Sequence, residues 1–300
     1  MPPFDEYAVM VLCAADVDTI WHDLPAPNTG NPILPGPVAN RYAYVTTEYF
    51  SAVAQLRCDD QFITKGENVY FGLFLRCIKD LKPLKVGDYL VAVRGTMDQQ
   101  EWQDDAVSIF KTKGPAGWEG QVGDGFWGLY QSMTLNDLDG GGERSPPAPA
   151  IAAMVQAKRG NVFLAGHSLG AALATYLAAD LQNALAAIHP PVTFYPYFFA
   201  SPKTGTGDYV DDYQARVSYY TLVNYAIDLV PAVPPDLLGF RALKGGGPTH
   251  DVHVIMPPAP GALMPPTVPN NHSPIGYARM LDPANPAALA LLQAQAAAGH

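Results

Sequence analysis

The chain has 300 residues, of which 48% are hydrophobic and 15% charged, and its formal net charge is −10. This length suits one large α/β domain with ample chain to bury a core, so we expect residues 1–300 to form a single domain. The negative charge argues against binding to nucleic acid or to anionic membrane surfaces, whereas a neutral lipid or a small ester is compatible with it.

The expected secondary structure alternates between strand and helix from residue 89 onward. The expected elements, in chain order, are a strand at Tyr89–Val93, a helix at 149–158, a strand at 161–166, a helix at 168–187, and strands at Val192–Ala200 and Arg216–Val223. Stretches rich in proline or glycine at 25–37, 138–149 and 256–270 indicate loops. The alternation predicts a mostly parallel central sheet with helices on both faces.

Targeting and cysteine signals are few. The sequence contains no run of 18 apolar residues, which indicates no membrane span, and no Lys or Arg precedes Arg41, so the basic start of a signal peptide is missing. We therefore expect a soluble protein, either cytoplasmic or a secreted mature form. Cys13, Cys58 and Cys77 allow at most one intramolecular disulfide, and their apolar neighbours favour buried thiols.

The most informative segment is 161–170, which reads Asn-Val-Phe-Leu-Ala-Gly-His-Ser-Leu-Gly. An apolar strand runs here into a Gly-x-Ser-x-Gly pattern, and strong helix formers follow. Gly166 and Gly170 are expected to allow a sharp turn from strand to helix that holds Ser168 in a strained backbone conformation with its hydroxyl exposed. We predict that Ser168 is a nucleophile, and that His167 points away from its hydroxyl and serves packing.

The acid and the base of a catalytic triad are expected to follow the serine in that order. Asp228 comes directly after a predicted strand, where ligands and catalytic groups collect in α/β sheets, although a solvated turn carboxylate would look the same. For the base, His250 and His253 lie in a strand-like alternation that suits packing, and His300 is terminal. His272 follows a proline-rich loop just ahead of a helix, so we prefer it as the base.

With these three residues assembled, the chain resembles the class 3 (fungal-type) lipases of the α/β-hydrolase superfamily over about residues 85–280. The segments that carry the resemblance are Val91–Thr96 followed by Trp102, Gly125-Phe126, Phe199–Gly205, Asn224–Pro234, and His272 with Tyr277. Asp105 fits the first of these segments as a partner for Arg94. Two positions depart from the family pattern, since Asp124 stands where the family usually has His and Ala200 where it has Gly.

The resemblance implies an α/β-hydrolase fold with an oxyanion hole and a lid. The backbone N–H of Leu169, at the start of the helix after the serine, is one expected oxyanion donor, and by similarity the N–H of Thr96 is the other. The lid matches about residues 97–110, where Trp102, Val107, Ile109 and Phe110 would cover an apolar cleft. An ordinary surface helix would show the same pattern.

The resemblance further implies a lipase or esterase that hydrolyses acylglycerol-type carboxylic esters through a Ser-His-Asp triad and an acyl-enzyme. A phospholipase A1, a polyester hydrolase or an acyltransferase would use the same triad, and a non-catalytic binding protein of the α/β-hydrolase fold belongs to a different class. The sequence has no phosphate-binding or dinucleotide-binding glycine motif. We expect no cofactor and no metal, with neutral lipid or a small ester as partner.

Overall fold

Eight strands form the central sheet of the computed structural model, which describes residues 4–25, 30–36, 41–60, 67–95, 110–140, 144–245, 250–256 and 271–298. The parallel strands are β3 (Tyr89–Val93), β7 (Val162–His167), β8 (Phe194–Phe199), β10 (Tyr220–Tyr225) and β12 (His250–Ile255). Beyond β3, antiparallel pairing adds β2 (Glu67–Cys77), β1 (Phe50–Asp60) and β6 (Thr134–Asn136). The expected mostly parallel sheet is confirmed.

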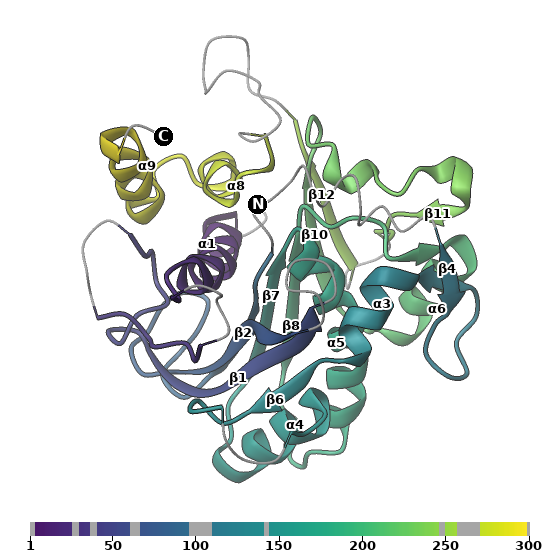
Figure 1. The fold of residues 1–300 in the computed structure, drawn as a ribbon, viewed down its shortest axis with the longest axis horizontal. Coiled ribbons are helices and arrows are strands. Elements are labelled where there is room, and N and C mark those ends of the chain that lie inside the picture. The colour runs from purple at the N-terminus through teal and green to yellow at the C-terminus, as the bar shows by residue number, and fades with distance from the viewer. Residues whose placement is uncertain are drawn as a thin grey trace.

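Helices cover both faces of this sheet (Figure 1). One face carries α1 (Phe4–His22), α8 (Pro274–Leu281) and α9 (Pro286–Ala298). The other carries α3 (Asp124–Gln131), α4 (Pro147–Lys158), α5 (Leu169–Ala186) and α6 (Gly207–Arg216). Successive side chains of a strand point to opposite faces, so Leu164 joins the core under α5 while its neighbour Phe163 joins the core under α1. The central strands are apolar throughout because both faces are buried.

One buried cluster of apolar side chains lies on each face of the sheet, and the carboxyl ends of the parallel strands all lie at one edge between these clusters. In the strand register Val93 lies opposite Gly166, His167 opposite Phe199, and Phe199 opposite Val223. The residues that follow these strands therefore meet at one place, as expected for the site edge of an α/β sheet.

Helix α1 lies in a part of the chain to which the sequence analysis assigns no element. It is buried on nearly all sides because it packs on the sheet and is covered by α8, which lies beside it (Figure 1). Asp16 ties it to the chain that follows, since its carboxylate accepts the backbone N–H groups of Ala43, Tyr44 and Val45 at 2.8, 2.6 and 2.8 Å. Burial raises the pKa of Asp16 to about 6, although these three donors act to lower it.

Two local differences from the expected elements have clear causes. The strand expected at Arg216–Val223 begins only at Tyr220, because Arg216 is still the last residue of α6 and forms an ion pair with Asp212 one turn earlier, at 2.8 Å. The helix expected at 149–158 begins two residues earlier, with Pro147 in its first turn, where the missing proline N–H costs nothing.

A second, small sheet lies beside the main one and was not expected from the sequence. Its strand order is β11-β9-β5-β4, all antiparallel, with β4 (Lys111–Lys113), β5 (Gln121–Gly123), β9 (Gly205–Thr206) and β11 (Phe240–Arg241). The short 3₁₀ helices η1 (Val230–Ala232) and η2 (Asp236–Leu238) connect β10 to this sheet. Strands of two or three residues are too short to show a period of two in the sequence.

Candidate active site

Ser168 occupies the sharp turn between β7 and α5 and has a strained backbone. Its φ and ψ are 59° and −128°, a combination that a residue with a side chain rarely adopts. The surrounding strands hold it there, since its N–H donates to the carbonyl of Phe199 at 3.0 Å. Strain of this kind is typical of the nucleophile turn in α/β-hydrolases, where it lifts the serine hydroxyl out of the backbone.

The glycines on either side of Ser168 permit the expected sharp turn, and close packing is the reason that glycine is needed there. Neither Gly166 nor Gly170 has a positive φ. A Cβ on Gly166 would lie 2.4 Å from the carbonyl oxygen of Gly170, and a Cβ on Gly170 would lie 2.5 Å from the carbonyl oxygens of Val93 and Arg94. The turn therefore requires glycine because backbone passes against backbone, while Ser168 itself carries the unusual dihedral angles.

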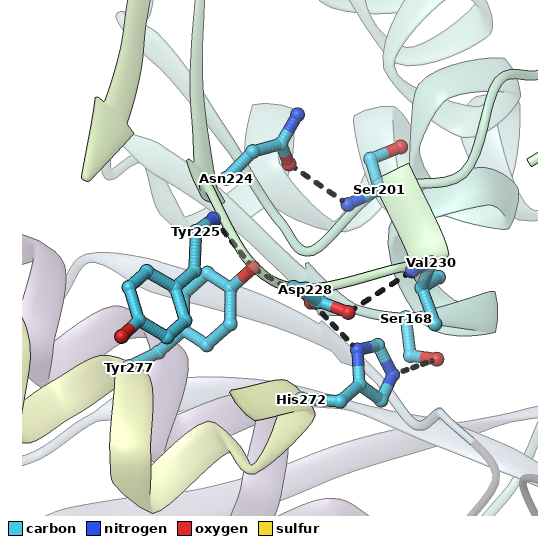
Figure 2. A network of polar contacts seen from close by, with 8 residues as sticks. All are labelled: Ser168, Ser201, Asn224, Tyr225, Asp228, Val230, His272 and Tyr277. Atoms are coloured by element: carbon cyan, nitrogen blue, oxygen red, sulfur yellow. Dashed lines mark hydrogen bonds and ion pairs between the residues drawn. The ribbon is translucent and has the colours of Figure 1, made fainter. Parts of the chain in front are cut away.

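The structure brings the three predicted triad residues into hydrogen-bond contact (Figure 2). Nε2 of His272 lies 2.7 Å from Oγ of Ser168, and Nδ1 of His272 lies 2.8 Å from Oδ2 of Asp228. All three side chains are buried. Because the contacts join residues 104 and 44 positions apart, only the folded chain brings these groups together.

Local structure explains how His272 and Asp228 reach their places. His272 directly precedes Ser273, whose side chain accepts the N–H of Gly276 and so caps α8, and Pro274 occupies the first turn. Asp228 follows β10 in a turn in which its N–H donates to the carbonyl of Tyr225 at 3.0 Å. A capped helix start and a closed turn leave both side chains little freedom to move.

Tyr277 completes the surroundings of Asp228, a role that the sequence analysis did not assign to it. Its hydroxyl donates to Oδ2 of Asp228 at 2.8 Å and accepts the backbone N–H of Tyr225 at 2.8 Å (Figure 2). The other oxygen of Asp228 accepts the N–H of Val230 at 3.0 Å. Burial raises the pKa of Tyr277 well above its usual value, and the neighbouring carboxylate adds to this, so the phenol stays protonated and donates.

The other histidines lie outside the hydrogen-bond chain from Ser168 to Asp228. His167 packs its ring against His272, with centroids 4.7 Å apart, and burial lowers its pKa well below the usual value. His250 is hydrogen-bonded through Nε2 to the carbonyl of Val217 at 2.7 Å, and His253 lies 2.9 Å from Asp251 on the same strand. His300 lies outside the described residues.

The proposed oxyanion donors are described only in part. Leu169 is buried and is the first residue of α5, so its N–H is among the first-turn N–H groups that have no acceptor within the helix. Thr96, Asp105 and the lid residues Trp102, Val107 and Ile109 lie outside the described residues. Phe110, at the end of the expected lid, is described and is 72% exposed.

Within the ranges described, no group of three His, Cys, Asp or Glu side chains could hold a metal ion, and no helix is long and apolar enough to cross a membrane. Cys13 and Cys77 are free thiols, and all three cysteines, Cys58 included, are buried. Burial raises the pKa values of the Cys13 and Cys77 thiols, so these two are poor nucleophiles.

Comparisons with known proteins match one family model and several relatives. The family model described as Lipase (class 3) matches residues 90–238. Phospholipase A1-II 3 of Oryza sativa subsp. japonica is 27% identical over 220 residues, which cover 64% of this chain and 52% of the relative. A secreted mono- and diacylglycerol lipase, LIP4 of Malassezia restricta, is 35% identical over 86 residues, covering 28% of this chain and 27% of the relative.

The solved structure of the Rhizomucor miehei triacylglyceride lipase superposes with a TM-score of 0.56 at 15% identity, over 82% of this chain and 78% of that one. This likeness shows a shared fold. The chain spans about half the length of the phospholipase A1 relative that it matches.

Proposed function

The chain belongs to the class 3 lipase family of the α/β-hydrolase superfamily, and on that premise we propose that it hydrolyses carboxylic esters of the acylglycerol type. The observation that carries this proposal is the pair of hydrogen bonds from Ser168 to His272 and from His272 to Asp228, at 2.7 and 2.8 Å. A serine hydroxyl becomes a useful nucleophile when a base accepts its proton as it attacks.

In the proposed mechanism, Oγ of Ser168 attacks the ester carbonyl carbon and its proton passes to Nε2 of His272. Asp228 holds the imidazole through Nδ1–H and stabilises the imidazolium that forms. His272 then gives the proton to the departing alcohol oxygen, which leaves an acyl-enzyme. In the second half, His272 takes a proton from water as the water oxygen attacks the acyl carbon. His272 then returns this proton to Oγ of Ser168 as the acid leaves, which restores the free enzyme.

Negative charge develops on the carbonyl oxygen in both halves, and two backbone N–H groups are proposed to stabilise it. The first belongs to Leu169, where the N-terminus of α5 adds the favourable end of the helix dipole. The second belongs to Thr96, on the strength of the Arg-Gly-Thr segment that follows β3. Donors fixed in place before the reaction stabilise the charge without reorganisation.

The substrate is proposed to be a glyceride ester with little charge, which agrees with the net charge of −10. The relative named as a mono- and diacylglycerol lipase supports this class. A phospholipase A1 activity is the second candidate, because the relative that bears that name aligns over more of this chain.

The decisive test is a panel of p-nitrophenyl esters from short to long acyl chains, assayed with the wild type, Ser168→Ala and Ser201→Ala. Ser201 is the matched control, since it is also buried at this edge of the sheet but its hydroxyl donates to the carbonyl of Pro202. We expect Ser168→Ala to lower kcat by at least about 10³-fold, while Ser201→Ala stays close to the wild type.

Two further measurements test Ser168 as the nucleophile and separate the two candidate activities. A phosphonate inhibitor should leave its adduct on Ser168, and an adduct elsewhere or none would contradict the proposal. Diacylglycerol and a phospholipid with the same acyl chains, compared by kcat/KM, decide between the lipase and the phospholipase A1. A Ser168→Ala variant with full ester hydrolysis would refute the serine mechanism.

A further inference from the structure

Arg94 is fully buried directly after β3, next to the candidate active site. Its Nε donates to the carbonyl of Tyr70 at 2.8 Å, and its Nη1 donates to the carbonyl of Gly95 at 2.9 Å. Its guanidinium carbon lies 4.0 Å from the ring centroid of Trp21 and 4.1 Å from that of Phe71. Helix α1 and strand β2 thus each contribute an aromatic ring that packs on the guanidinium group.

Burying a guanidinium group is costly unless its charge is compensated and its N–H groups are hydrogen-bonded. The charge is partly balanced by Asp18 of α1, a buried carboxylate whose pKa burial raises while Arg94 lowers it. What a guanidinium adds to such a site is directional hydrogen bonding from a rigid, planar group. Its described donations go to backbone carbonyls, one of which belongs to the next residue, Gly95.

Gly95 lies against the turn that holds the nucleophile. A Cβ on Gly95 would lie 2.9 Å from the carbonyl oxygen of His167 and 3.4 Å from Cβ of Ser168. On the other side of the turn, Gly170 packs against the carbonyl oxygen of Arg94 itself. The backbone at Arg94 and Gly95 is therefore in contact with the chain on both sides of Ser168.

We propose that Arg94 is a positioning residue that fixes the orientation of the peptide unit after Gly95 for transition-state stabilisation. In a trans peptide unit the carbonyl and the following N–H point in opposite directions, so a donor that holds the carbonyl also sets the direction of that N–H. The N–H of this unit is the second oxyanion donor of the proposed mechanism. This inference rests on the proposed function.

The contacts of Arg94 with α1 and β2, called the clamp from here on, also give the first 80 residues a part in catalysis. Trp21 and Asp18 come from α1, and Phe71 and Tyr70 from β2, both outside the segment that the family model matches. Without Nη1 of Arg94, the Gly95 carbonyl has lost a fixed donor and its peptide unit can rotate. A rotated unit would present a carbonyl oxygen to the developing oxyanion, which destabilises the transition state and not the bound substrate.

The test compares Arg94→Lys and Arg94→Met with Arg76→Met as the matched control. Arg76 also lies over an aromatic ring, that of Tyr89 at 5.8 Å, but at the opposite end of β3. Lysine keeps the charge but lacks the planar fork that reaches two carbonyls. For both Arg94 variants we expect kcat on a p-nitrophenyl ester to fall by roughly 10- to 100-fold with KM changed less than about threefold, and no such fall for Arg76→Met.

A pair of inhibitors gives a readout that a merely structural role would not move. Ser168 adds to a trifluoromethyl ketone and forms a hemiketal whose carbonyl oxygen becomes an oxyanion, with the proton passing to His272. The methyl ketone of the same alkyl chain binds without accumulating this adduct. We expect the affinity of the Arg94 variants to fall for the trifluoromethyl ketone by about the same factor as kcat, and to stay unchanged for the methyl ketone.

Equal losses of affinity for both ketones, or a wild-type kcat in a folded Arg94 variant, would overturn the inference. If both Arg94 variants fail to fold, Trp21→Phe loosens the clamp while keeping the guanidinium group, and an unchanged ratio of the two affinities in it would equally overturn the inference. Failure of the proposed function looks different, since the wild type would then show no ester hydrolysis that depends on Ser168.

Discussion

Replacing Tyr277 by phenylalanine should destabilise the fold without creating a cavity. The ring is kept, but the hydroxyl that donates to Asp228 and accepts the N–H of Tyr225 is lost, each contact being 2.8 Å long and buried. A hydrogen bond to a charged group contributes about 1.5–3 kcal/mol, and a buried N–H left unpaired costs about 1–3 kcal/mol. Together we expect a loss of roughly 3–5 kcal/mol in the free energy of unfolding.

The measurement is urea unfolding at pH 7.5, with Tyr225→Phe as the control. Tyr225 lies beside Tyr277, with ring centroids 6.4 Å apart, and its own hydroxyl makes no hydrogen bond within the described ranges. The control keeps its buried ring and loses no hydrogen bond to the described residues, so it should stay within about 0.5 kcal/mol of the wild type. Equal stability of the two variants would refute the reasoning that the Tyr277 hydroxyl supports Asp228.

Three further predictions concern stability. Burial lowers the pKa of His167, so near pH 6.5 the unfolded chain binds a proton at this residue and the folded chain does not. The free energy of unfolding should therefore fall as the pH drops below 6.5. Urea unfolding at pH 7.5 and 5.5 should show this fall reduced by about 1 kcal/mol in His167→Gln. Arg159 has φ 60° and ψ 154°, a region that favours glycine, so Arg159→Gly should raise the free energy of unfolding by about 1 kcal/mol; a loss would contradict the assigned strain. Gly170→Ala should destabilise the protein by about 3 kcal/mol or more, because the added Cβ would lie 2.5 Å from two carbonyl oxygens. Gly128→Ala is the control, since its added Cβ would have nothing within 4 Å and should stabilise α3 by about 0.5–1 kcal/mol. Similar thermal midpoints for the two variants would argue against this packing.

The three residues proposed as a triad could be selected from the sequence because each has a local signal. Ser168 lies in a short motif between an apolar strand and a helix, and Asp228 follows a strand end. His272 precedes a helix that begins with Ser273 and Pro274, a start signal readable without coordinates. The alternation of strand and helix was enough to predict the parallel sheet on which these positions meet.

The supporting contacts could not be predicted, because they join distant residues that lack a motif. Trp21 reaches Arg94 from a helix that is buried on nearly all sides, and such a helix shows no polar face by which a sequence pattern could place it. The His-x-x-x-x-Tyr spacing pointed to Tyr277, but its contact with Asp228 depends on how α8 docks on β10. Ala200, where the family usually has Gly, has a φ of 50°, which explains the family preference but not this exception.

The pairing of α1 with α8 sets a condition on biosynthesis. These helices share one core, yet roughly 250 positions separate them, which a ribosome needs about 12–50 s to translate. During that interval the newly made α1 has no cover and is open to chaperones or to wrong partners. Because the segment that carries α8 also delivers His272, the contact of His272 with Ser168 and the closing of this core arrive together during synthesis.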